Sequence, residues 1–132
     1  MKNEKVNTSE KYDLQERLIS FAIGIILLVE SLPNTKTANH VGGQVLRSGT
    51  SPAFNYGEAQ SAESRNDFIH KMKVCLKELR ETQVGLKIIY RLKIAKSQEE
   101  VERILKECSE LVSIFVKSIG TAELNRLAVK KK

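Results

Sequence analysis

The sequence predicts an all-α protein, an antiparallel up-and-down four-helix bundle. Three observations carry this prediction: capping signals mark helix starts, apolar residues recur at helical spacing, and no alternation typical of strands competes with them. Short connections between long helices favour antiparallel neighbours. With 132 residues, of which 41% are hydrophobic and 29% charged, the chain is expected to form one domain with its own core.

The first predicted helix spans residues 14–31. Asp13 and Glu16 fit a capping box, in which a side-chain oxygen accepts from a free amide of the first turn, and Pro33 ends the helix. This helix is apolar nearly all round, so a monomeric bundle would expose an apolar patch on it. We therefore expect its outer face to contact another subunit.

The second predicted helix spans residues 36–62 and contains the run GGQVLRSGT. The run lacks the spacing and the lysine of a phosphate-binding loop, G-x-x-x-x-G-K-[ST]. As a helix, the segment carries a seam of small residues that lets another helix approach closely: Gly42, Gly49, Ala53 and Gly57. Pro52 predicts either a kink in one helix or two collinear helices.

Three polar residues of this helix, Ser51, Asn55 and Glu58, are spaced to share one face. Without a nucleophile or a metal ligand beside them, they indicate a structural polar cluster rather than a catalytic one. Their spacing leaves open whether they hold the bundle together or face a partner.

The third predicted helix spans residues 65–94 and starts at Ser64, with Asp67 as the acidic partner of its capping box. Its apolar residues form a stripe that we expect to face the core: Phe68, Met72, Cys75, Leu76, Leu79, Leu86 and Tyr90. A second stripe beside it is basic: Lys73, Lys77, Arg80, Lys87 and Arg91. Glu78 and Glu81 are expected on another side.

The fourth predicted helix spans residues 98–119, with Ser97 and Glu100 as its capping box and Gly120 as a left-handed cap. The chain then divides into a flexible N-terminal segment at residues 1–12, the bundle at 13–120 and a basic C-terminal tail at 121–132.

The net charge of +6 lies mostly in two places. Residues 65–96 sum to +6 and residues 126–132 to +4, which favours an anionic partner. The most apolar run, residues 18–29, is too short for a membrane span, which needs about 20 residues. Because residues 1–17 also lack the positive bias of a signal peptide, a cytoplasmic protein with no membrane partner is expected.

The sequence contains only weak motifs for catalysis or metal binding. Arg65 and His70 resemble the Arg-x-x-x-x-His motif of HEPN ribonucleases, but Ser64 and Asp67 already explain the run as a helix start. The D-x-x-H pair of Asp67 with His70, and a separate His40, are too few for a di-iron bundle. The cysteines, Cys75 and Cys108, are expected to be reduced and unreactive. We therefore expect no catalytic residue, no metal and no cofactor.

A longer run carries a family resemblance. The segment SGTSPAFNYGEAQSAESRNDFIHKMKVCLKELRET, followed by VGLKIIYRLKI, resembles the proteins encoded in 23S rRNA intervening sequences, also called S23-type proteins. The resemblance covers residues 12–119. It implies an antiparallel four-helix bundle that assembles into a homopentamer. It also implies a relation in fold to the accessory protein of diversity-generating retroelements, which works with nucleic acid and a reverse transcriptase without a catalytic site of its own.

The chain departs from the family pattern at Gly85, where a large aromatic residue is usual. A glycine inside a helix costs about 1 kcal/mol relative to alanine, and a packing gap is expected there.

Three functional hypotheses follow. The first is a non-enzymatic homo-oligomer that binds RNA or DNA with low sequence specificity through the basic stripe and the tail residues Lys130, Lys131 and Lys132. The second is a structural module whose partner is a protein, such as a reverse transcriptase. The third is a HEPN-like ribonuclease built on Arg65 and His70.

Overall fold

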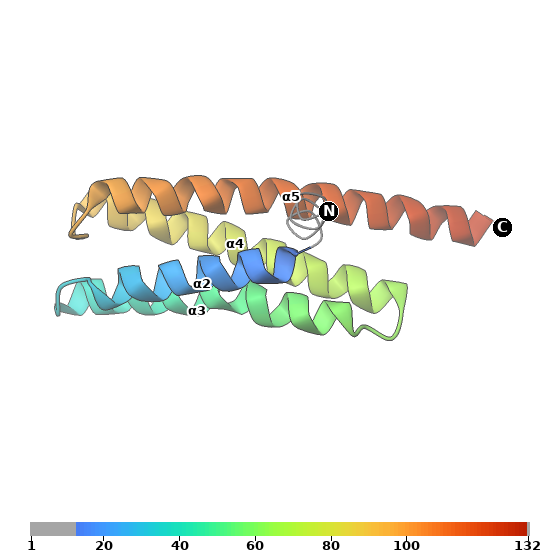
Figure 1. Cartoon of the computed structure of the whole chain (residues 1–132), viewed down its shortest axis with the longest axis horizontal. Helices are drawn as coiled ribbons and strands as arrows, with labels where there is room; N and C mark the ends of the chain where they lie inside the picture. Colours follow the sequence, from blue (N-terminus) through green and yellow to red (C-terminus); the bar gives the residue numbers. More distant parts are fainter. Residues whose placement is uncertain (1–12, 132) are drawn as a thin grey trace, which may run out of the picture.

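The structure, a computed structural model, describes residues 13–131, and within that range the regular elements are four helices (Figure 1). They are α2 at Leu14–Glu30, α3 at Lys36–Gln60, α4 at Arg65–Leu92 and α5 at Gln98–Lys131. Successive helices run in opposite directions (Figure 1). The predicted all-α four-helix fold is confirmed, and the predicted N-terminal segment at residues 1–12 lies outside the described residues.

Side-chain caps fix the helix starts. Asp13 accepts from the amide of Glu16 at 3.1 Å, and Ser64 accepts from the amide of Asp67 at 3.0 Å. Ser97 accepts from the amide of Glu100 in the same way. Each cap pairs an amide that has no partner within the helix, so the three predicted starts are confirmed.

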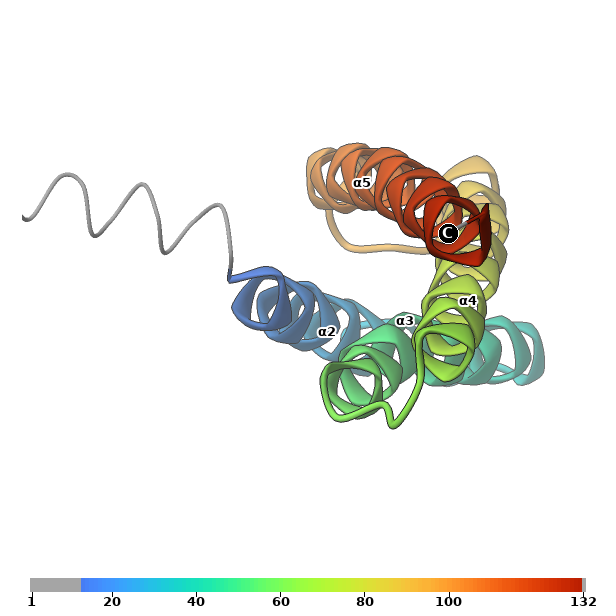
Figure 2. The same cartoon turned by 90° about the vertical axis from the view of Figure 1, so that its right-hand side faces the viewer.

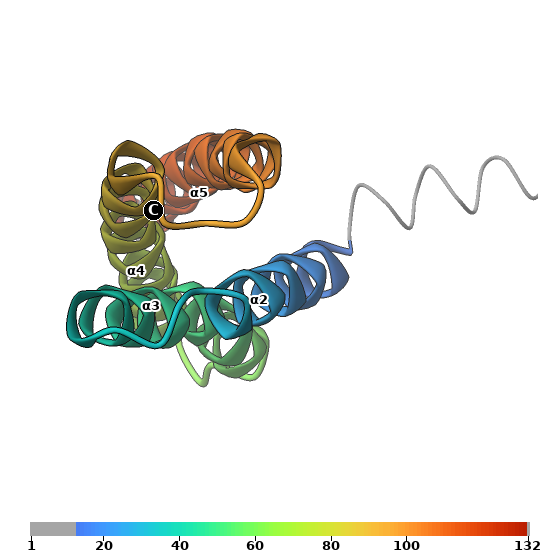
Figure 3. The same cartoon turned by 90° about the vertical axis from the view of Figure 1, so that its left-hand side faces the viewer.

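The four helices enclose one apolar core. α3 and α4 pack together most extensively, whereas α2 and α5 pack least closely of the neighbouring pairs, as the end-on views show (Figures 2 and 3). The core therefore centres on α4, which packs against both α3 and α5. Its largest fully buried side chains are Leu18, Ile25, Met72, Leu79, Leu86, Ile89, Leu111 and Phe115.

The small residues of α3 let α2 approach. A methyl group on Gly49 would lie 2.8 Å from Ile25 Cγ1, and one on Gly42 would lie 3.2 Å from Leu32 Cδ1. Gln15 donates to the carbonyl oxygen of Ala53 at 2.9 Å. The predicted seam is therefore a helix contact, and α3 runs through Pro52 as one continuous helix.

The buried face of α4 differs in part from the predicted stripe. Met72, Cys75, Leu79 and Leu86 are buried as predicted, but Phe68, Leu76 and Tyr90 are only half-buried. The buried set also includes Ile69, Glu78, Thr82 and Ile89, of which Glu78 and Thr82 contact Arg47 and Ser48 of α3. Because α4 contacts both α3 and α5, its buried arc is wider than one apolar stripe.

Two further expectations are wrong. The last helix does not end at Ile119: Gly120 is helical without a positive φ, and α5 continues through the predicted tail to Lys131. Contacts to α4 support the extension, because Glu123 pairs with Lys73 at 3.0 Å. The expected packing gap at Gly85 is also absent, since Val45 fills the space where a side chain would start.

Candidate nucleic-acid interface

The basic stripe lies on the outer face of α4. Its five residues fall within an arc of about 80° and span about 27 Å of the helix, at 100° and 1.5 Å per residue. The opposite face of α4 is buried against α3 and α5, with Leu79 and Leu86 fully inaccessible. All five basic side chains are exposed: Lys73, Lys77, Arg80, Lys87 and Arg91.

Most of this basic charge is not neutralised by neighbours. Lys73 forms an ion pair with Glu123 of α5 at 3.0 Å. Within the described part of the chain, the structure contains no ion pair of the other four. Four unpaired cations on one helix face produce a local positive potential that attracts anions.

The acidic residues of α4 lie away from the stripe, on the side that faces α3. Glu78 is 7% exposed and pairs with Arg47 at 3.1 Å, and Glu81 pairs with the same guanidinium. Arg47 thus pairs with both carboxylates on the α3 side of the helix. The separation predicted from the sequence is present, and the basic face keeps its charge.

The predicted tail lysines are only partly described. The backbone of Lys130 and Lys131 continues α5 past the start of α4, and Lys132 lies outside the described residues. At that end, Arg126 donates to Asn66 Oδ1 at 3.3 Å, so α5 is attached to the N-terminus of α4.

The polar cluster of α3 divides into two contacts. Asn55 donates to Ser51 Oγ at 2.8 Å within the helix, and Lys71 Nζ of α4 donates to Glu58 Oε1 at 2.7 Å. The Glu58 carboxylate raises the pKa of Lys71. Glu58 therefore helps to join α3 to α4, while the hydrogen bond of Asn55 to Ser51 lies within α3.

The two residues of the ribonuclease interpretation do not converge within one chain. Arg65 and His70 are both exposed on α4, and five residues of helix place their side chains about 140° apart. His40 lies on α3. Within residues 13–131, no group of three or more histidine, cysteine or acidic side chains is arranged to hold a metal ion.

Both cysteines are enclosed by the bundle. The Cys75 thiol donates to the carbonyl oxygen of Pro52 at 3.6 Å, and the Cys108 thiol donates to that of Leu79 at 3.3 Å. Desolvation raises the pKa of each thiol to about 12. A protonated, buried thiol is a poor nucleophile, as expected from the sequence.

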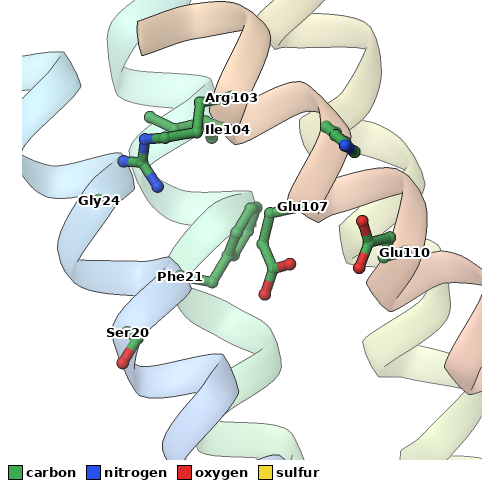
Figure 4. Close-up of a pocket in the computed structure, with 8 residues that line it drawn as sticks. Ser20, Phe21, Gly24, Arg103, Ile104, Glu107 and Glu110 are labelled. Atoms are coloured by element: carbon green, nitrogen blue, oxygen red, sulfur yellow. The ribbon is translucent and has the colours of Figure 1, made fainter.

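A pocket of about 340 Å³ lies between α2 and α5 (Figure 4). Its lining includes Phe21 and Ile104 from the two helices, with Glu107 and Glu110 on the α5 side. Arg17 donates to both oxygens of Glu107 at 2.8 Å and to Glu110 at 2.9 Å. These pairs raise the pKa of Arg17 and join α2 to α5. The pocket thus combines charged side chains of both signs with apolar ones, whereas the charged side chains on the outer face of α4 are all basic.

None of the described helices is both long and apolar enough to span a lipid bilayer.

Comparison with known proteins agrees with the fold and the resemblance. Residues 10–117 match the family of 23S rRNA-intervening sequence proteins. The chain is also similar to a crystal structure of a protein of unknown function from the S23 ribosomal protein family of Bacteroides thetaiotaomicron, at 33% identity and a TM-score of 0.73, over 80% of this chain and 96% of that one. Among curated proteins, no sequence matches this chain. The matched region exceeds half of the chain, and the protein belongs to the 23S rRNA-intervening sequence protein family.

Proposed function

We propose that this protein is a non-enzymatic homo-oligomer, pentameric as the family resemblance implies, that binds RNA or another nucleic acid through the basic face of α4. The observation that carries the proposal is a set of exposed cations along that helix that form no ion pair with the described residues: Lys77, Arg80, Lys87 and Arg91. Phosphate contacts of this kind supply most non-specific affinity for nucleic acids.

The expected specificity is low. Phosphate contacts position a protein on nucleic acid without reading the sequence. Among the described residues, the most exposed aromatic side chain is Phe54, at 73%, and it lies on α3 and not on α4. Tyr90 donates its hydroxyl hydrogen to Glu102 at 2.9 Å. The basic face thus offers little for base stacking, and shape and charge would dominate recognition.

Assembly would strengthen such binding. A ring of subunits presents the basic face several times, and linked weak contacts bind more tightly than one. Exposed apolar residues on α2, including Ile23 at 51% and Leu27 at 66%, support self-association, because contiguous apolar patches on protein surfaces mark contact sites.

Charge reversal tests the proposal. We expect Arg80→Glu with Lys87→Glu to weaken binding to a structured RNA by roughly tenfold or more, measured by fluorescence anisotropy. The matched control is Lys106→Glu with Lys117→Glu, which changes the net charge equally at two exposed positions of α5. Equal losses from both pairs would contradict a defined α4 interface and leave only non-localised charge attraction.

A further inference from the structure

Two faces of this chain, one on α2 and one on α4, are complementary in charge and could pack together between two subunits. We infer that the outer face of α2 in one subunit binds the outer face of α4 in the next. The inference rests on the homo-oligomer of the proposed function and names the surfaces that build it. It does not depend on nucleic acid.

The α2 face consists of an acidic, an apolar and a second acidic residue at seven-residue spacing: Glu16, Ile23 and Glu30. Seven residues make nearly two helical turns, so the three side chains lie on one line about 21 Å long. Ile23 is 51% exposed, and three more exposed apolar residues flank it: Ile19, Ile26 and Leu27.

The α4 face repeats this pattern with the opposite charge. Lys77, Val84 and Arg91 are exposed and also stand at seven-residue spacing, so their line is again about 21 Å long. Val84 is 59% exposed, and Ile88 and Leu92 extend the apolar strip towards the end of the helix.

When the two lines are superposed, Ile23 of one subunit lies against Val84 of the next, and each glutamate lies against a basic side chain. In the described residues the structure contains no ion pair of these four charged side chains, so each is available to a partner. An apolar centre with complementary charges at its edge is the arrangement of specific protein interfaces. Two α2 faces would instead bring glutamates together, which disfavours a symmetric contact through that face.

Within one chain, α3 separates α2 from α4 (Figures 2 and 3). The two faces therefore cannot satisfy each other in a monomer. A contact between different faces is heterologous, and its repetition closes into a ring or grows into a chain. A ring agrees with the cyclic assembly proposed above.

The subunit contact inferred here involves only part of the basic stripe. Gln83 donates to Ser109 of α5 at 2.9 Å, which locates the α5 side of the helix. Arg80 and Lys87 lie nearer that side, whereas Lys77 and Arg91 lie on the line with Val84. In the assembled protein the subunit contact would therefore bury Lys77 and Arg91, and the phosphate-binding residues of the proposed function would be reduced to Arg80 and Lys87.

A charge swap tests the contact without nucleic acid, by sedimentation velocity over a range of protein concentrations. Glu16→Lys with Glu30→Lys is expected to raise the apparent dissociation constant of the assembly roughly tenfold or more. Lys77→Glu with Arg91→Glu should do the same, and a chain with all four substitutions should regain assembly. Wild-type assembly in the first variant would overturn this contact, and so would failure of the four-substitution chain to recover while its helix content is native.

Disulfide trapping supplies a second measurement that does not depend on charge. Under mild oxidation, a mixture of Ile23→Cys and Val84→Cys chains should form cross-linked dimers, while neither variant should do so alone. Lys117→Cys, at an exposed site of α5, serves as the control partner. Cross-linking of Ile23→Cys to itself, or to the control as readily as to Val84→Cys, would overturn the pairing but leave self-association intact. A monomeric wild-type chain would overturn both this inference and the proposed oligomer.

Discussion

Gly85 of α4 lies directly against Val45 of α3, so that a methyl group on Gly85 would overlap Val45 Cγ2. Val45 is 1% exposed and has little room to move. At this point the two helices approach more closely than any residue with a Cβ would permit. The glycine is therefore required by this helix contact, and it does not leave a gap.

Gly85→Ala is expected to lower the free energy of unfolding by roughly 1–3 kcal/mol, because overpacking outweighs the gain in helix propensity. Gly43→Ala is the control: Gly43 is helical and nothing lies near its missing Cβ, so alanine should stabilise by about 0.5–1 kcal/mol. Urea unfolding measures both. In a Val45→Ala background, the penalty for Gly85→Ala should shrink, and an unchanged penalty would contradict the contact.

The buried hydroxyls of Ser48 and Thr82 join α3 to α4. Thr82 Oγ1 lies 2.8 Å from Ser48 Oγ and donates to the carbonyl oxygen of Glu78 or to Ser48. Thr82→Val keeps the shape but leaves the Ser48 hydroxyl without this partner, which costs roughly 1–3 kcal/mol. Adding Ser48→Ala should recover part of that loss. Strictly additive effects in the double-mutant cycle would show that the hydroxyls do not interact.

Substitution of Gly120 tests whether residue 120 lies in the interior of a helix or at its end. Since Gly120 is helical, exposed and free of close neighbours, Gly120→Ala should stabilise the protein by about 1 kcal/mol. A left-handed cap would give the opposite sign, because alanine is strained at positive φ. Thermal unfolding of the variant measures the sign, and a lower melting temperature would contradict a continuous α5.

The two buried thiols make stability fall at high pH. The pKa of Cys75 and of Cys108 is raised to about 12, so the folded state retains protons that the unfolded state loses above about pH 9. The unfolded state then binds fewer protons, and the free energy of unfolding declines as pH rises from about 9 to 12, by at most about 1.4 kcal/mol per unit for each thiol. Cys75→Ala with Cys108→Ala should flatten that slope. Equal slopes in the variant and the wild type would contradict the assignment.

The same burial predicts slow thiol chemistry. At pH 8 an aromatic disulfide reagent should label neither cysteine in the native protein, and both should react in denaturant. Fast labelling of the native protein would contradict the enclosed positions.

The helix starts were predictable because they are local. Asp13, Ser64 and Ser97 each bond to an amide three residues later, and that pairing can be seen in the sequence. The end of α5 was not predictable from Gly120, because a glycine is compatible with both a cap and a helix interior. Tertiary contacts decide between them, and the ion pair of Glu123 with Lys73 joins residues far apart in the chain.

The basic stripe was predictable from helical spacing, but its surroundings were not. Spacing places Lys77 and Arg91 on one face of α4 wherever its neighbours lie. That Lys73 pairs with Glu123, while Arg47 pairs with Glu78, depends on how α3 and α5 pack against α4. The burial of Thr82 has the same origin, since its partner Ser48 lies on another helix.

The salt dependence of RNA affinity shows directly whether the basic face of α4 binds phosphates. If the α4 face neutralises phosphates, the logarithm of the binding constant falls linearly with the logarithm of salt concentration, by about 0.7–0.9 for each phosphate contact. We expect a steep slope for the wild type that becomes shallower in Arg80→Glu with Lys87→Glu and is unchanged in Lys106→Glu with Lys117→Glu. A flat slope for the wild type, or the same slope in all three proteins, would contradict it.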